Sequence, residues 1–364
     1  MDEEGDFYNF NSEDLLDYFN ITEVDCSAKH LYLEARDIVG PVFLSILTAF
    51  GIIGNFALFC VILYTPQMRT AANILIINLT VGDLFYIICT APFYIETELF
   101  PCMNQPIWAC KIQSFFPVVG QGGCVYSLAA LSRERYGAIV HGIQARQRSG
   151  KLRNAFTVCL VWIISFITGI PVLIAATKQS EQQCSSLPQF STLAKIYETY
   201  RFFFLYLIPL IVIAIYYALM AQTLFKSITG FGDNRTGNHQ TEARKRLAII
   251  ILIVTVFFGV FWFPYYVYIL WFQFAFESQN AYGNDLTVTF FRNFHYIMAL
   301  INSSLNPWCV FVMSSGHRRR LIQCLCCGKF GRNETSKAPT SSQCGTRRRG
   351  SGGVSFTQVT TTPL

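Results

Sequence analysis

One carboxylate lies inside a long apolar stretch of the sequence. Asp83 is the only acid between Thr70 and Ile95, and an ionisable residue in such a stretch is costly to bury and marks a functional site by default. Other apolar stretches carry three amides and a hydroxyl that we expect to converge on it: Asn55, Asn302, Ser303 and Asn306. This donor set predicts either a pocket for a sodium ion that favours one conformation, or a hydrogen-bonded contact between helices without an ion.

The chain has seven apolar stretches, and three of them carry these polar groups. Each has few or no charged residues and reaches the roughly 20 residues that cross a bilayer. Because lipid offers the backbone no hydrogen bonds, we expect each stretch to be helical. The stretches are 38–68, 70–95, 112–132, 154–177, 202–225, 247–276 and 293–316. With 52% hydrophobic and 14% charged residues, the chain is not a soluble enzyme, and its fold class is an all-α membrane protein with a seven-transmembrane helix bundle.

The distribution of charge predicts the orientation in the membrane. The first 28 residues contain acids but no Lys or Arg, whereas basic residues follow the third and seventh stretches and precede the sixth. Basic loops stay in the cytoplasm, so we expect a multi-pass plasma-membrane protein with its N-terminus outside and its C-terminus inside. The expected parts are an extracellular acidic segment 1–37, the bundle 38–314, a short amphipathic eighth helix 315–328, and a disordered cytoplasmic tail 329–364.

The same topology indicates where covalent modification is expected. Asn20 begins the one Asn-x-Thr acceptor for glycosylation that would be exposed outside the cell. Four cysteines fall on the oxidising side and allow three pairings: Cys26, Cys102, Cys110 and Cys184. Cysteines just after the seventh stretch are candidates for palmitoylation: Cys324, Cys326 and Cys327. We expect the cysteines of the membrane helices to be small core residues: Cys60, Cys89, Cys124, Cys159 and Cys309.

Short motifs recur in a fixed order along the seven stretches. They are Gly54-Asn55, Asn78 to Asp83, Glu134-Arg135-Tyr136, Trp162, Pro209, Tyr217, Phe258, Trp262-Phe263-Pro264, Asn302 and Asn306-Pro307. Each motif alone is weak, but together, each in its own stretch, they are specific. On these motifs the chain resembles the rhodopsin-like, or class A, G protein-coupled receptors over nearly all of its helical part.

The resemblance implies a mechanism and a set of partners. Arg135, held by Glu134 at rest, is expected to be released to a heterotrimeric G protein when helix six swings about Pro264. The full set of implied switch residues is Glu134, Arg135, Tyr136, Tyr217, Phe258, Trp262, Pro264, Asn306 and Pro307. The resemblance also implies a disulfide between Cys110 and Cys184, which leaves Cys26 and Cys102 to pair or to stay free. A receptor kinase and arrestin are expected at the Ser- and Thr-rich tail.

Within this family the chain is most similar to the bombesin, endothelin and CCHamide peptide receptors. The similarity includes Met68-Arg69, Ala91-Pro92, Ala130 to Ser132, Ile170-Pro171, Ala243 to Ala248 and the unusual Asn306-Pro307-Trp308. It implies an extracellular peptide ligand and signalling through Gq and calcium. Pro117 and Tyr296 depart from the bombesin receptors' glutamine and arginine, so a familiar bombesin-type ligand is not expected. The expected ligand-binding residues are Phe93, Tyr94, Gln113, Phe116, Gln121, Tyr265, Tyr266, Ile269, Arg292, His295 and Tyr296.

Other functions remain as alternatives. Tyr8 lies two residues after Asp6 and Tyr18 directly after Asp17, and this acidic segment resembles the sulfated tails of chemokine receptors, which capture small basic proteins. A non-signalling orphan or scavenger receptor is a third reading, against which the intact Glu134-Arg135-Tyr136 stands. Motifs for enzymes are not found, so we expect no enzymatic activity, no nucleic-acid partner and no cofactor other than an allosteric sodium ion. The lipid bilayer is the remaining partner.

Overall fold

The structure of the chain is a computed structural model that describes residues 35–99, 105–140, 150–178, 184–185, 187, 190–229, 238–276 and 285–325. Within these residues seven helical stretches are long and apolar enough to cross a membrane, which confirms the predicted fold class. They are α3 (Ala35–Tyr64), α4 (Ala71–Leu99), α5 (Ile107–Val140), α6 (Gly150–Ala175), α7 (Thr192–Phe202) continued by α8 (Ile208–Thr229), α9 (Asn238–Trp271) and α10 (Asp285–Met313).

Short elements connect or extend these helices. A 3-10 turn, η1 (Pro66–Met68), follows α3, and a further helix, α11 (Ser315–Leu325), follows α10. Two short strands, β1 (Thr177–Lys178) and β2 (Cys184–Ser185), pair antiparallel with Lys178 opposite Cys184. The chain divides into two compact units, 1–322 and 323–364, and the seven helices all belong to the first.

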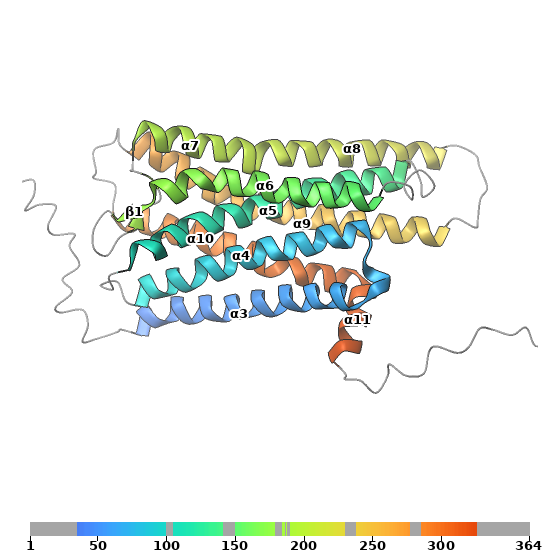
Figure 1. The fold of residues 1–364 in the computed structure, drawn as a ribbon, viewed down its shortest axis with the longest axis horizontal. Helices are drawn as coiled ribbons and strands as arrows, with labels where there is room; N and C mark the ends of the chain where they lie inside the picture. Colours follow the sequence, from blue (N-terminus) through green and yellow to red (C-terminus); the bar gives the residue numbers. More distant parts are fainter. Residues whose placement is uncertain are drawn as a thin grey trace, which may run out of the picture. The chain divides into compact units, whose positions relative to one another are not determined.

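Helix α5 lies at the centre of the packing. It contacts α4, α6, α8 and α9, while α10 contacts α3, α4 and α9, and Figure 1 shows these helices side by side. The buried side chains of the largest apolar cluster come from all of these helices, and they include Leu128 of α5 and Phe258 of α9. A smaller, separate apolar cluster joins Leu44 of α3, Ile87 and Ala91 of α4 and Leu300 of α10, so the core has one large and one small apolar cluster.

A pair of glycines brings α4 and α5 unusually close together. A Cβ atom added at Gly82 would lie 2.9 Å from the carbonyl oxygen of Gly120, and one added at Gly120 would lie 2.7 Å from the carbonyl oxygen of Gly82. Small residues allow helix backbones to approach in this way inside membranes. The contact lies next to Asp83 of α4 and one turn before Cys124 of α5, so it sets the spacing between these two side chains.

The helix that contains α7 and α8 has one π-helical turn, η2 (Phe203–Leu207). Pro209 follows this turn, and because proline has no N–H it cannot donate to the carbonyl of Leu205. A π turn is a common way to absorb such a break and is frequent near functional sites. A second π turn, η4 (Phe272–Phe276), extends the end of α9.

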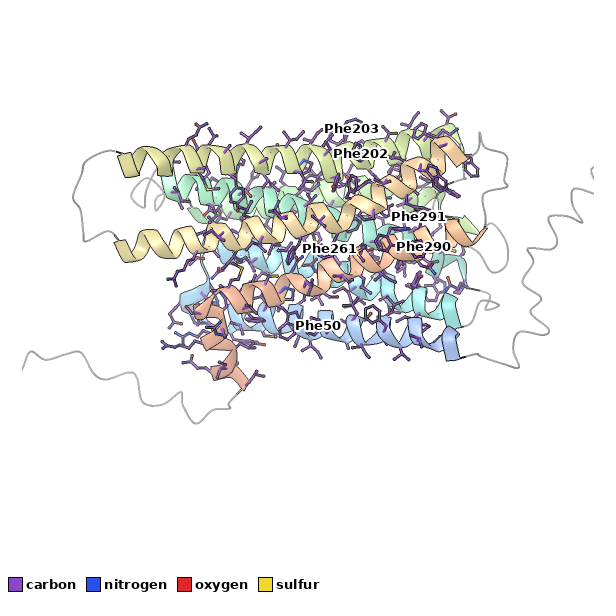
Figure 2. The ribbon with its side chains drawn as sticks, turned by 180° about the vertical axis from the view of Figure 1, so that it is seen from behind. Phe50, Phe202, Phe203, Phe261, Phe290 and Phe291 are labelled. Carbon is purple, nitrogen blue, oxygen red and sulfur yellow. The ribbon has the colours of Figure 1, made fainter. Side chains whose placement is uncertain are left out.

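The outward surfaces of the helices are apolar, as expected for contact with lipid. Large exposed side chains include Phe203 of the π turn and Phe290 and Phe291 of α10, all three of which are labelled in Figure 2. Cys159 is also exposed on α6, so its prediction as a core residue was wrong. The reason is that α6 packs mainly against α5 and turns its remaining surface outward.

The fifth membrane span was predicted to begin too late. The spanning stretch is Thr192–Thr223, whereas the sequence prediction began at residue 202. The prediction used the absence of charge as its criterion, and that criterion excluded Glu198 and Arg201. In the structure both residues lie inside the helix and are buried, because each neutralises the other.

Candidate functional site

The first buried polar cluster surrounds Asp83. Its side chain is fully buried, and its Oδ2 atom accepts a hydrogen bond of 2.9 Å from Nδ2 of Asn306. Its Oδ1 atom accepts from the thiol of Cys124 at 3.3 Å, and the hydroxyl of Ser303 is a further partner. The carboxylate thus joins α4 to α5 and α10, which are far apart in sequence.

The predicted partner Asn55 joins this cluster through the backbone of α10. Its Nδ2 atom donates to the carbonyl oxygens of Gly51 and Ser303, both at 3.0 Å. Three buried amide oxygens in the cluster have no hydrogen-bond partner in the described part of the chain: those of Asn55, Asn302 and Asn306. Unpartnered buried oxygens next to a carboxylate fit a small hard cation, which prefers oxygen ligands. The thiol of Cys124, a soft group, and the unpartnered amide nitrogen of Asn302 do not fit such an ion.

An aromatic column lies between this cluster and the end of the bundle that was predicted to be extracellular. Trp262 is 2% exposed, and its ring contacts those of Tyr86, Phe258 and Tyr265 at centroid distances of 5.3, 5.8 and 5.7 Å. Tyr86 lies one turn from Asp83 on α4. Tyr265 is therefore connected through the single ring of Trp262 to the helix that carries Asp83.

A second polar cluster lies next to this column, on the side away from Asp83, and we call it the outer cluster. The Nη1 atom of Arg201 donates to the Tyr265 hydroxyl at 2.6 Å, and its Nη2 atom donates to Oε1 of Gln121 at 3.3 Å. The amide nitrogen of Gln121 donates to the Tyr266 hydroxyl at 2.8 Å. Glu198 completes the cluster as the ion-pair partner of Arg201, at 3.0 Å. These residues come from α5, α7 and α9, so one network joins three helices.

Stacked rings extend this cluster toward α10 and α4. The ring of His295 contacts Tyr265 at 5.2 Å and stacks on Tyr268 at 4.7 Å. Tyr296 stacks on Tyr94 at 4.3 Å. The structure thus connects six of the predicted ligand-binding residues through direct contacts with one another or with Arg201: Gln121, Tyr265, Tyr266, His295, Tyr296 and Tyr94.

Of the other predicted ligand-binding residues, Gln113 and Phe116 contact residues that were not predicted to bind the ligand. Gln113 donates to Gln105 near the end of α5. Phe116 packs against Phe85 and Phe115, on the side of α5 where Phe85 meets Trp162 of α6. Phe93 and Ile269 are half-buried, and the side chain of Arg292 lies outside the described residues.

Two residues of the outer cluster, Glu198 and Arg201, were missed by the sequence analysis, and so was the role of Cys124. The available signal was an acid and a base three residues apart, within a stretch that also contains Tyr197 and Tyr200. An acid and a base at this spacing face the same side of a helix. Together with the two tyrosines they form a helical pattern that is unusual in a connecting loop. Cys124 gave no comparable signal, because a thiol is also a common apolar core residue.

The end of the bundle that was predicted to be cytoplasmic contains the predicted switch residues. Glu134 and Arg135 are both 8% exposed, and the Tyr136 ring contacts that of Tyr216 at 5.6 Å. The hydroxyl of Tyr217 on α8 donates to the carbonyl oxygen of Ala248 on α9 at 2.7 Å. Phe258 is buried, Pro264 lies inside α9, and Pro307 lies inside α10 next to Asn306.

Trp308, which follows the Asn306-Pro307 motif, contacts α3. Its indole stacks on Phe50 at 4.6 Å and donates to the Phe50 carbonyl oxygen at 3.3 Å. A Cβ at Gly54 would lie 2.6 Å from the indole nitrogen, so the glycine makes room for this ring. The unusual tryptophan of the motif therefore ties α10 to α3.

Several predicted modification sites lie outside the described residues. They are Tyr8, Tyr18, Asn20, Cys26, Cys102, Cys326 and Cys327. Cys110 is buried and disulfide-bonded, while Cys324 is exposed and free.

His317 at the start of α11 is a buried titratable residue. Its Nδ1 atom lies 2.7 Å from the Ser314 hydroxyl. Burial lowers the pKa of the imidazole to about 4.

Comparison with known proteins agrees with the resemblance inferred from the motifs. The chain is 30% identical over 312 residues to the neuropeptide CCHamide-1 receptor of Drosophila melanogaster, an alignment that covers 81% of this chain and 62% of that receptor. It is 29% identical over 308 residues to bombesin receptor subtype-3 of Ovis aries, with 81% and 77% covered. Residues 54–309 match the model of the 7 transmembrane receptor (rhodopsin family). With seven spanning helices and the two buried polar clusters in place, the chain belongs to the rhodopsin family of seven-transmembrane receptors.

Proposed function

We propose that this chain is a cell-surface receptor that an extracellular peptide activates and that passes the signal to a heterotrimeric G protein. The chain is thus a signalling receptor rather than an enzyme. Its relatives carry names that refer to the peptides CCHamide-1 and bombesin. A receptor of this kind needs two conformations of the helix bundle. The ligand and the G protein must both bind the same conformation more tightly than the other.

The observation that carries the proposal is a row of hydrogen bonds between the same two transmembrane segments. Arg201 of α7 donates to Tyr265 of α9 at the outer end, and Tyr206 of the π turn donates to the carbonyl of Gly259 at 2.8 Å further in. Tyr217 of α8 donates to Ala248 at the cytoplasmic end. A ligand that changes the outermost bond therefore acts on the packing of α9 along its whole length.

The outer cluster supplies the chemistry for a peptide ligand. Tyrosine rings provide contact area at low entropic cost and carry a polar group at one end. The cluster combines such rings with an amide, an imidazole and an ion pair, all on helices that also reach the cytoplasm. Ligand sites typically have this composition of aromatic walls and a few placed polar groups.

The cytoplasmic end supplies the proposed docking residue. Arg135 would be exposed to the G protein when α9 moves away from α8 and the Tyr217 bond opens. Coupling to Gq and calcium is proposed by analogy with the similar peptide receptors. Desensitisation by a receptor kinase and arrestin is proposed from the hydroxyl-rich tail, which lies outside the described residues.

The orientation and covalent features follow from the same proposal. The N-terminus would be extracellular, with Asn20 glycosylated, and the C-terminus cytoplasmic, with palmitate on Cys324 and its neighbours Cys326 and Cys327. The disulfide of Cys110 would have Cys184 as its partner and would fix the β1–β2 loop to the outer end of α5. Cys26 and Cys102 would be the second pair.

A sodium ion is proposed as an allosteric ligand of the Asp83 cluster. The carboxylate of Asp83, the Ser303 hydroxyl and the unpartnered amide oxygens of Asn302 and Asn306 would hold it. The ion would neutralise the buried carboxylate, and the helices that supply these oxygens would then be held in one arrangement.

The proposal is tested by a calcium assay in cells that express the epitope-tagged chain while a library of secreted peptides is applied. We expect at least one peptide to give a saturable response, and Arg135→Ala to abolish that response while surface labelling and peptide binding remain. The exposed Arg133→Ala on the same helix is the matched control. A response that persists in Arg135→Ala would contradict the proposed coupling, and the absence of any peptide response would contradict the proposed ligand class.

A further inference from the structure

The outer cluster contains an ion pair at membrane depth. Glu198 and Arg201 lie three residues apart on α7, and their side chains are only 7% and 8% exposed, respectively. Removing two such charges from water costs several kcal/mol for each ion, and the pair regains this only with good geometry and further hydrogen bonds. A pair of this kind is therefore expected to have a purpose beyond stability.

The geometry of the pair leaves one edge of the guanidinium only partly bonded. Both carboxylate oxygens of Glu198 accept from the same nitrogen, Nη1, at 3.2 and 3.0 Å. The Nη2 atom makes only the 3.3 Å bond to Gln121, and the buried Nε atom has no acceptor in the described part of the chain. Nε and Nη2 form one edge of the guanidinium, and that edge is the one that a carboxylate can take with two parallel hydrogen bonds.

Arg201 is held in place independently of Glu198. The Tyr265 hydroxyl accepts from Nη1, and the guanidinium lies 5.9 Å from the Tyr197 ring centroid and 5.2 Å from that of Tyr265. Glu198, in contrast, accepts hydrogen bonds only from Arg201 in the described part of the chain. A group that binds Arg201 can therefore use a donor whose position is already fixed.

We propose that Arg201 binds a carboxylate of the activating ligand through its Nε and Nη2 atoms, and that this contact selects acidic ligands. The inference rests on the proposed function and names the chemistry of the ligand. The two bonds would satisfy the buried Nε donor, whose unmet desolvation cost is relieved only when an acceptor arrives. Because Arg201 also bonds Tyr265, which contacts Trp262, a ligand at this edge would be linked to the aromatic column through Arg201 and Tyr265.

The carboxylate has two sources in a peptide, its C-terminus and an Asp or Glu side chain. The probe is a library of synthetic peptides made in matched copies. One pair of copies has either a free C-terminal carboxylate or a C-terminal amide, and a second pair has either the Asp and Glu residues or Asn and Gln in their place. Calcium responses are recorded in cells that express the full chain. We expect the removal of one particular carboxylate to lower the potency of an active peptide by about tenfold to a hundredfold, the range for a charge-assisted bond.

Variants of the pair assign this effect to Arg201. In Arg201→Gln the acid and its carboxamide copy should be equally potent, and in Arg201→Lys, which keeps the charge without the planar edge, the difference should shrink. In Glu198→Gln the acidic peptide should gain potency severalfold, because a competing negative charge is removed. Lys195→Gln, which removes a cation from the same helix, should leave the difference unchanged.

The opposite results have distinct meanings. A loss of response in Glu198→Gln would show that the ligand contributes a basic group, and equal potency of acid and carboxamide copies on the unmodified chain would overturn the inference while the proposed function stands. No response to any peptide would defeat the proposed function and the inference with it. If Arg201→Gln does not reach the cell surface, Arg201→Lys and Glu198→Gln decide the question, since both keep a polar side chain of similar length.

Discussion

The close contact between α4 and α5 predicts a large effect of adding one methyl group at Gly120. The new Cβ in Gly120→Ala would lie 2.7 Å from the Gly82 carbonyl oxygen and 2.9 Å from the Tyr86 nitrogen, and both are backbone atoms. Favourable contacts between heavy atoms need about 3.5 Å, so the two helices must separate by roughly half an ångström or more. Overpacking of this kind costs about 1–3 kcal/mol.

Thermal melting of the detergent-purified chain measures this cost. Gly137→Ala is the matched control, because it lies on the same helix and its added Cβ would have nothing within 4 Å. Alanine favours the helix by about 1 kcal/mol over glycine, so Gly137→Ala should melt at the same temperature as the unmodified chain or slightly higher, and Gly120→Ala several degrees lower. Equal melting temperatures for the two variants would refute the close contact and with it the spacing between Asp83 and Cys124.

Three further predictions concern the polar groups. Tyr217→Phe removes the bond to Ala248 and should raise agonist-free signalling per surface receptor about threefold, the value of an average hydrogen bond within a membrane; Tyr216→Phe is the control, and equal signalling from both would contradict the role of the bond. Cys124→Ser replaces a soft donor with an oxygen, so sodium chloride should lower agonist potency more in this variant than in the unmodified chain, and not at all in Asp83→Asn. The reference is a chloride salt of an organic cation. A sodium effect that is the same in both variants as in the unmodified chain would exclude the ion. Burial lowers the pKa of His317 from its ordinary 6.5 to about 4, so the folded state favours the neutral imidazole. The contribution of the neutral imidazole to stability is complete above pH 6.5 and is lost as the pH falls toward 4. The melting temperature of His317→Gln should therefore fall less than that of the unmodified chain between pH 7 and 5, and parallel curves would contradict this.

The sequence was sufficient for the fold because each spanning helix carries its own signal. A stretch of about 20 residues without charge identifies a spanning helix without reference to the other helices. The motifs around Asp83, Arg135 and Pro264 then assign the stretches to their order in the bundle. The ends of the helices were less well predicted. Charge was used to end the fifth stretch, and charge is an unreliable boundary where an acid and a base pair inside the membrane, as Glu198 and Arg201 do.

The outer cluster shows why the rest could not be predicted. Gln121, Tyr265 and Tyr266 were identified from their places on the third and sixth stretches, but which side chains bond to one another depends on helix rotation and on the π turn at residues 203–207. That turn changes which residues of the fifth span face inward, and a single sequence carries no periodic signal for it. The contact of Cys124 with Asp83 likewise depends on the close approach of α4 and α5 at two glycines.

We propose that an event at the outer bond between Arg201 and Tyr265 moves the end of α9 that is predicted to be cytoplasmic. Spin labels on Arg153→Cys of α6 and Arg246→Cys of α9, two exposed positions, can follow that movement in a chain whose other reactive cysteines are replaced by serine. Addition of an activating peptide from the calcium screen should lengthen the distance between the labels, and Arg201→Gln should require more peptide for the same change. The claim is contradicted if the distance distribution stays the same with and without peptide while the same preparation activates its G protein.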